Sequence, residues 1–118
     1  MLDFPIPHIP PIRFVESLIS ADAQSASVKI GFDTIPTLGM LIEAAAQSSS
    51  GIISDNSKTQ MGVLVTLKNI KLLQELKATK YIVDIDLDYK LDAFKYFSFK
   101  VSDNNTIVAT GSLSIALQ

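Results

Sequence analysis

One long apolar stretch with helical spacing, set among segments that alternate between apolar and polar residues, most constrains the fold of this chain. Apolar side chains recur every three or four residues from about Thr37 to Ser54, which is the pattern of one buried helix face. Pro36 precedes this stretch and Asp55-Asn56 follows it, so the helix is predicted to lie between them. It is the only long helix that the sequence predicts.

Strands are predicted on both sides of the helix, two before it and four after it. Strands with one apolar and one polar face favour an antiparallel sheet whose polar face is exposed to solvent. The helix would cover the apolar face. The fold class is therefore α+β. The segments are about Arg13–Ile19, Ser25–Phe32, Gly62–Leu73, Tyr81–Tyr89, Phe97–Val101 and Ile107–Leu117, with a hairpin turn at 103–105.

Three local features of the strands are specific enough to check. The apolar phase slips near Lys68-Asn69, which predicts a β-bulge there. Strict alternation places Tyr89 on the same apolar face as Tyr81. It also places Ile107 inward in the last strand.

The start of the chain is rich in proline. Four of the five prolines fall within the first twelve residues, where they fix φ and remove backbone donors. Residues 1–12 are therefore predicted to form an extended, non-helical arm. A length of 118 residues suits one domain, so we expect residues 1–118 to form a single unit.

Composition excludes several classes of partner. The net charge is −2 and no cluster of basic residues occurs, so nucleic acid is not an expected partner. The start lacks the pattern of a signal peptide and no apolar stretch is long enough to span a membrane, so a cytoplasmic location is expected. Hydrophobic residues make up 47%, which is high enough for a small domain to favour self-association.

Several chemistries lack their motifs. There is no cysteine, no glycine-rich phosphate loop and no nucleophile elbow, and no metal or cofactor is expected. Asp84, Asp86 and Asp88 share one strand face, but no glycine or later glutamate completes a calcium loop. A solvated strand face is the better interpretation of these three carboxylates.

Glu43 is the one carboxylate within the apolar helix. It shares a helix side with Gly39 and Gln47, four residues away in either direction. A desolvated carboxylate favours its protonated form and suits a general acid. The alternative is that Glu43 faces solvent at the edge of the helix.

His8 is the single histidine, and it lies between Pro7 and Ile9 in the arm. Histidine is the usual proton carrier near neutral pH, and the neighbouring prolines would hold it in place. The alternative is a surface histidine without a chemical role.

Three segments together resemble a known family. Pro7-His8, the helical segment Gly39–Gln47 and the closing segment Val108–Leu117 are similar to the hotdog-fold 3-hydroxyacyl-acyl-carrier-protein dehydratases. The likeness is greatest to a shortened, divergent branch found in aryl-polyene-type lipid pathways. It implies a long central helix wrapped by an antiparallel sheet of five to six strands, and a homodimer or higher oligomer with its active sites at the interface. It also implies an acyl carrier protein or another acyl thioester as partner.

The resemblance assigns roles to individual residues. In this family a histidine takes a proton from C2 of a 3-hydroxyacyl thioester, and a helix acid protonates the departing hydroxyl. Glu43 matches the acid and Gln47 the glutamine that follows it. Thr37, Leu38 and Gly39 match the helix start, where backbone amides polarise the thioester carbonyl.

The sequence departs from the family at the histidine. Most members carry it in a Gly-His-Phe-Pro loop before the helix, whereas Asp33–Pro36 contains none. His8 fits the position used in the shortened branch, so the resemblance implies a His8–Glu43 pair. Two alternatives remain open, a non-catalytic acyl-binding hotdog subunit and a hotdog thioesterase in which Glu43 activates water.

Overall fold

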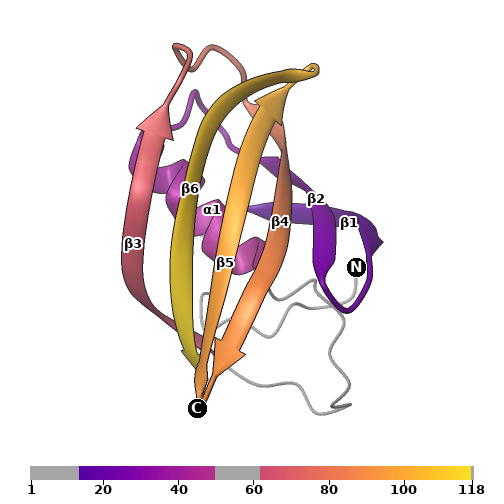
Figure 1. The fold of residues 1–118 in the computed structure, drawn as a ribbon. Helices are drawn as coiled ribbons and strands as arrows, with labels where there is room; N and C mark the ends of the chain where they lie inside the picture. Colours follow the sequence, from indigo (N-terminus) through magenta and orange to yellow (C-terminus); the bar gives the residue numbers. More distant parts are fainter. Residues whose placement is uncertain (1–13, 50–61, 118) are drawn as a thin grey trace.

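The computed structural model describes residues 14–49 and 62–117, which form one helix and six strands (Figure 1). In chain order these are β1 (Val15–Ala21), β2 (Ser25–Gly31), α1 (Leu38–Ser48), β3 (Gly62–Leu72), β4 (Lys80–Leu91), β5 (Phe94–Asp103) and β6 (Thr106–Leu117). The arm at residues 1–12, with His8, lies outside the described residues, as does the predicted end of the helix at 50–54.

The six strands form one sheet in the order β1-β2-β4-β5-β6-β3. Every neighbouring pair in it is antiparallel. The helix lies behind the sheet in Figure 1, across the face that we call the inner face; the opposite face is the outer face. The predicted α+β class and antiparallel sheet are confirmed, and β1 and β3 are its two edges.

The helix packs its small apolar side onto the sheet. Its main contacts are with β1, β2, β4 and β5. Leu41, Ala44 and Ala45 are fully buried, and the two alanines let the helix approach the strands closely. The helix begins where the sequence predicts, after Thr37.

The core consists of the inner rows of the strands together with this side of the helix. The alternation predicted for the second strand is confirmed, because Ala26, Val28, Ile30 and Phe32 are all buried. The other buried hydrophobic residues of the sheet are Val15, Tyr81, Val83, Ile85, Phe97, Phe99, Val101, Val108, Ala109, Leu113 and Ile115.

The predicted bulge in β3 is present. The pairing with β6 shifts between Lys68 and Lys71, and Asn69 takes a positive φ of 56°. A Cβ at Gly111 would clash with the Ile70 side chain and would come within 2.8 Å of Phe99 Cζ. The glycine therefore makes room for Ile70 to reach the core.

Two further bulges overturn the predicted orientation of Tyr89 and Ile107. The pairing of β4 with β5 shifts between Leu87 and Tyr89, so Tyr89 stacks on Tyr96 at a centroid distance of 4.4 Å. Tyr89 is 56% exposed. Between β5 and β6 the pairing also shifts by one residue, so Val108 is buried and Ile107 is exposed. An extra residue in one strand reverses the faces of the residues beyond it, which strict alternation does not allow for.

Candidate functional site

Five of the six site residues predicted from the sequence lie at or on the helix. Thr37, Leu38 and Gly39 form its first turn, and Glu43 and Gln47 follow at intervals of four residues. The structure therefore places these five along about three turns of α1. His8, the sixth, lies outside the described residues.

The first turn presents backbone amides. The Thr37 hydroxyl accepts a hydrogen bond from the Met40 N–H at 3.2 Å, and the Thr37 carbonyl accepts one from the Leu41 N–H at 3.1 Å. The N–H groups of Leu38 and Gly39 have no acceptor within the helix, as is usual in a first turn. The helix dipole adds partial positive charge there, so this end can stabilise a developing negative charge.

Space is open beside Gly39. The residue is exposed, and among the described residues an added Cβ would meet only the Thr37 hydroxyl oxygen, at 3.8 Å. Glycine is less favourable than alanine in a helix by about 1 kcal/mol, and packing among residues 14–49 and 62–117 gives no reason for it. A close approach by another molecule to the backbone is a physical reason for the glycine.

Glu43 lies one turn after Gly39 on the same side of the helix. Its side chain is half-buried. A carboxylate in this position is shielded in part from water.

Gln47 is 2% exposed, and its Oε1 accepts a hydrogen bond from the Phe14 N–H at 2.8 Å. This bond fixes the helix to the residue before β1. The sequence assigned Gln47 only to substrate binding and missed this role, because the two partners lie 33 positions apart. Contact with a substrate stays a prediction.

Apolar surface remains uncovered beside the helix and along the edge strand β3. The exposed large hydrophobic residues include Ile35 before the helix, Val65, Leu67 and Leu72 in β3, and Leu73 after it. The high hydrophobic content was the sequence signal for this surface. A second protein surface or an apolar ligand would remove it from water.

Asp84, Asp86 and Asp88 lie in β4, and all three side chains are exposed. Asp86 accepts a hydrogen bond from the Ser25 hydroxyl, and Asp84 accepts one from the Ser27 hydroxyl. Among residues 14–49 and 62–117, no three His, Cys, Asp or Glu side chains gather as a metal site would require. In the same ranges, no helix has the length and apolar character needed to cross a membrane.

Comparison with solved structures identifies the architecture. The dehydratase heterocomplex ApeI:P from Xenorhabdus doucetiae matches 98% of this chain and 89% of its own, with a TM-score of 0.69 and 17% identity. The uncharacterized protein PH1136 from Pyrococcus horikoshii matches 99% and 93%, with a TM-score of 0.72 and 13% identity. A hypothetical thioesterase with coenzyme A from Streptococcus pneumoniae TIGR4 matches 86% and 84%, with a TM-score of 0.68 and 12% identity.

The chain has the hotdog fold. Identities this low establish the architecture and leave the activity to be argued from the site. No protein-family model and no curated protein matches the sequence.

Proposed function

We propose that this protein binds an acyl thioester at the start of α1 and eliminates water from its 3-hydroxyacyl chain. The observation that carries the proposal is the arrangement of an open, amide-bearing helix start at Leu38 and Gly39 with a half-buried carboxyl group, Glu43, one turn further along. A ligand that follows the helix meets a carbonyl-binding group first and a proton donor second.

The roles of the groups follow from the reaction. The amides of Leu38 and Gly39 donate hydrogen bonds to the thioester oxygen and stabilise the negative charge that develops on it. His8 removes a proton from C2, and the electrons of that C–H bond form the C2=C3 double bond. The C3–O bond breaks, and Glu43 gives its proton to the departing hydroxyl, which leaves as water.

The position of Phe14 supports the inclusion of His8. Gln47 holds the Phe14 backbone beside α1, one turn from Glu43. His8 precedes Phe14 by six residues, and an extended segment of that length spans at most about 20 Å. We propose that this short tether brings His8 to the Glu43 side chain, in its own protomer or in a second one.

A second chain would complete the site. β3 is an edge strand with eleven residues, and exposed apolar side chains lie along it. Long exposed edges of this kind are templates for pairing with another chain. We propose a dimer joined at β3, either with a second copy or with a different hotdog subunit, as the heterocomplex ApeI:P illustrates for another protein. We also propose that the acyl chain is carried as a thioester of an acyl carrier protein or of another thiol.

A thioesterase is the second candidate. A thioesterase with coenzyme A is among the structures of the same fold, and hydrolysis would use Glu43 to activate water without a histidine. A non-catalytic subunit that binds an acyl chain is the third possibility.

One assay separates the three. The protein is incubated with a 3-hydroxyacyl carrier-protein thioester, and the enoyl thioester and the free thiol are quantified by mass spectrometry. The proposal predicts the enoyl product with the thioester bond intact. Free thiol as the main product would favour hydrolysis, and no product from folded protein that binds the thioester would favour the non-catalytic subunit.

A further inference from the structure

The outer face of the sheet carries three ordered rows of side chains. Cross-strand pairing fixes which residues of β3, β6, β5 and β4 lie side by side. In that strand order the rows are Lys71, Thr110, Lys100 and Asp84; Lys68, Ser112, Ser98 and Asp86; and Thr66, Ser114, Tyr96 and Tyr89.

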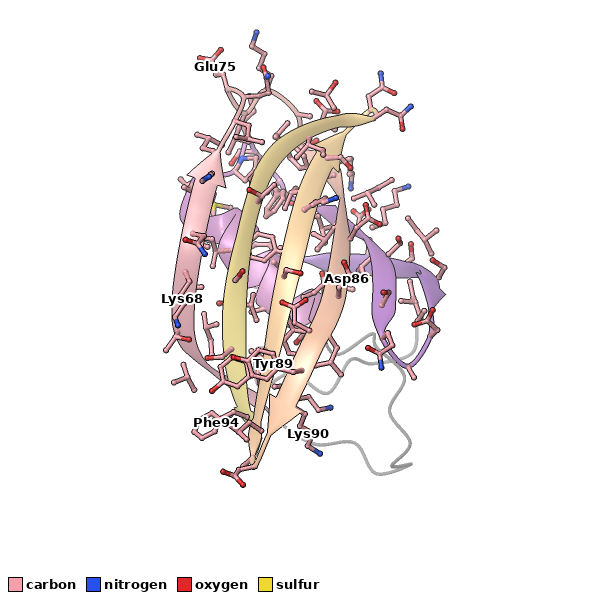
Figure 2. The ribbon with its side chains drawn as sticks, viewed as in Figure 1. Lys68, Glu75, Asp86, Tyr89, Lys90 and Phe94 are labelled. Carbon is pink, nitrogen blue, oxygen red and sulfur yellow. The ribbon has the colours of Figure 1, made fainter. Side chains whose placement is uncertain are left out.

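Charge is divided between the two sides of this face. β3 contributes Lys68 and Lys71, and neither β3 nor β6 contains a carboxylate. β4 contributes Asp84, Asp86 and Asp88, and Lys100 of β5 lies beside Asp84 in the first row. Figure 2 shows Lys68 and Asp86 on opposite sides of the face. Three strand spacings, about 14 Å, separate β3 from β4, so the two sets do not neutralise each other directly.

Both sets are exposed. The three aspartates accept hydrogen bonds from Ser27, Ser25 and Ser98, which fix the carboxylates without neutralising them. Within the described residues, the ion pairs are Lys77–Glu75 and Lys80–Glu16, and neither involves Lys68, Lys71 or the three aspartates.

We propose that a second copy of this chain docks on the outer face, about a two-fold axis that runs parallel to the strands between β5 and β6. Such an axis exchanges β3 with β4 and β6 with β5. Lys68 and Lys71 of one copy then lie over Asp84 and Asp86 of the other, and the reverse contact forms at the same time. A two-fold interface requires this self-complementarity, and the division of charge supplies it.

The third row fits the same axis. The bulge in β4 turns Tyr89 outward, where it stacks on Tyr96. The axis brings the Tyr89 ring over Thr66 of the other copy, a smaller and exposed side chain. Bulky residues therefore meet small ones on both sides of the axis.

The centre of the face is hollow. A depression of about 250 Å³ lies between β3 and β4 and is lined by Lys71, Asp86, Ser98, Thr110 and Ser112, among others. Contact between copies is then carried by the flanking charges, with water in the middle. Such an interface is sensitive to salt, because exposed charge pairs weaken as ionic strength rises.

The proposal is independent of the proposed function. The start of α1 lies behind the sheet (Figure 1). A second copy on the outer face would also leave the edge of β3 available for pairing with another strand. The outer-face contact would join two monomers into a dimer, or two dimers joined at β3 into a tetramer. In either case it doubles the mass.

Charge exchange tests the pairing directly. Variant one is Lys68→Glu with Lys71→Glu, and variant two is Asp84→Lys with Asp86→Lys. Sedimentation velocity at low salt and at about 0.5 M salt measures the mass of each and of an equimolar mixture. We expect wild type to double its mass at low salt and to halve it at high salt. Each variant alone should stay in the smaller particle, and the mixture should regain the doubled mass.

The control is Lys77→Glu with Lys90→Glu, which changes the net charge as variant one does but leaves the outer face intact. It should assemble as wild type does. Neutral variants, Lys68→Gln with Lys71→Gln and Asp84→Asn with Asp86→Asn, replace any charge-reversed variant that circular dichroism shows to be unfolded, and each should also stay in the smaller particle. A wild type that does not double at low salt, reversed variants that double alone, or folded reversed variants whose mixture fails to double would each overturn the proposal.

Discussion

The side-chain oxygen of Gln47 and the backbone N–H of Phe14 are 2.8 Å apart and form a hydrogen bond. The bond joins the helix to the residue before β1, although the two partners are 33 positions apart in the sequence. It therefore fixes where the first described residue lies relative to Glu43, one helical turn away. The proposed cooperation of His8 and Glu43 depends on that position.

Gln47→Leu should destabilise the protein by about 1–3 kcal/mol, because the partly buried Phe14 N–H loses its acceptor. The free energy of unfolding in urea measures the change. Ser48→Ala is the matched control, since the buried Ser48 hydroxyl bonds only within the helix, to the Ala44 carbonyl. An equal loss of unfolding free energy in both variants would show that the Gln47–Phe14 hydrogen bond contributes no more than a hydrogen bond within the helix.

Gly39→Ala should raise the free energy of unfolding by up to about 1 kcal/mol, because the added Cβ has room and alanine favours the helix. The same change should lower turnover of the acyl thioester, since the methyl group would occupy the space beside the Leu38 and Gly39 amides. Denaturation and a steady-state assay measure the two effects. Unchanged turnover would argue against substrate at the helix start.

Gly111→Ala should have the opposite effect on stability. Its Cβ would overlap the Ile70 side chain and would lie 2.8 Å from Phe99 Cζ, in a filled core. Overpacking of this kind typically costs about 1–3 kcal/mol. Urea denaturation of the Gly39→Ala and Gly111→Ala variants in parallel gives the comparison, and a Gly111→Ala variant as stable as wild type would contradict the packing described here.

Stability should fall in alkali partly through Tyr81. Burial raises the pKa of this phenol, and the negative charge of Asp103 raises it further, while the hydrogen bond with Ala78 acts in the opposite direction. Below pH about 10 the phenol is neutral in both the folded and the unfolded chain. Above that pH the unfolded phenol ionises first, so the free energy of unfolding decreases until the pH passes the folded pKa.

Tyr81→Phe provides the comparison for this alkaline loss. The variant lacks the titrating hydroxyl and also the two bonds that it makes with the Ala78 backbone. Its stability near neutral pH should be lower, but its decline above pH about 10 should be shallower than that of wild type. Urea unfolding at several pH values measures both slopes, and parallel slopes would show that Tyr81 does not titrate as described.

Much of the fold is contained in local sequence patterns. The spacing of apolar residues after Pro36 predicts the helix, and alternation in 25–32 predicts a buried row that the structure confirms. The phase slip at Lys68-Asn69 predicts a bulge because the slip occurs within the apolar pattern itself.

Other features depend on a partner strand that local patterns do not contain. The bulges that turn Tyr89 and Ile107 outward are defined by their pairing with β5, and alternation continues through both positions in the sequence. The helix side shared by Gly39, Glu43 and Gln47 was predicted from spacing alone. The bond between Gln47 and Phe14 is a long-range contact, so no spacing rule reveals it.

The most direct test of the central claim is the rate at which the wild type, Glu43→Gln and His8→Ala convert a 3-hydroxyacyl carrier-protein thioester to the enoyl thioester. We predict turnover by the wild type and a loss of at least about 100-fold in each variant, the range expected when a general acid or base is removed. Circular dichroism should show that both variants remain folded. A wild type that forms no enoyl product, or a His8→Ala variant as fast as wild type, would contradict the proposed mechanism.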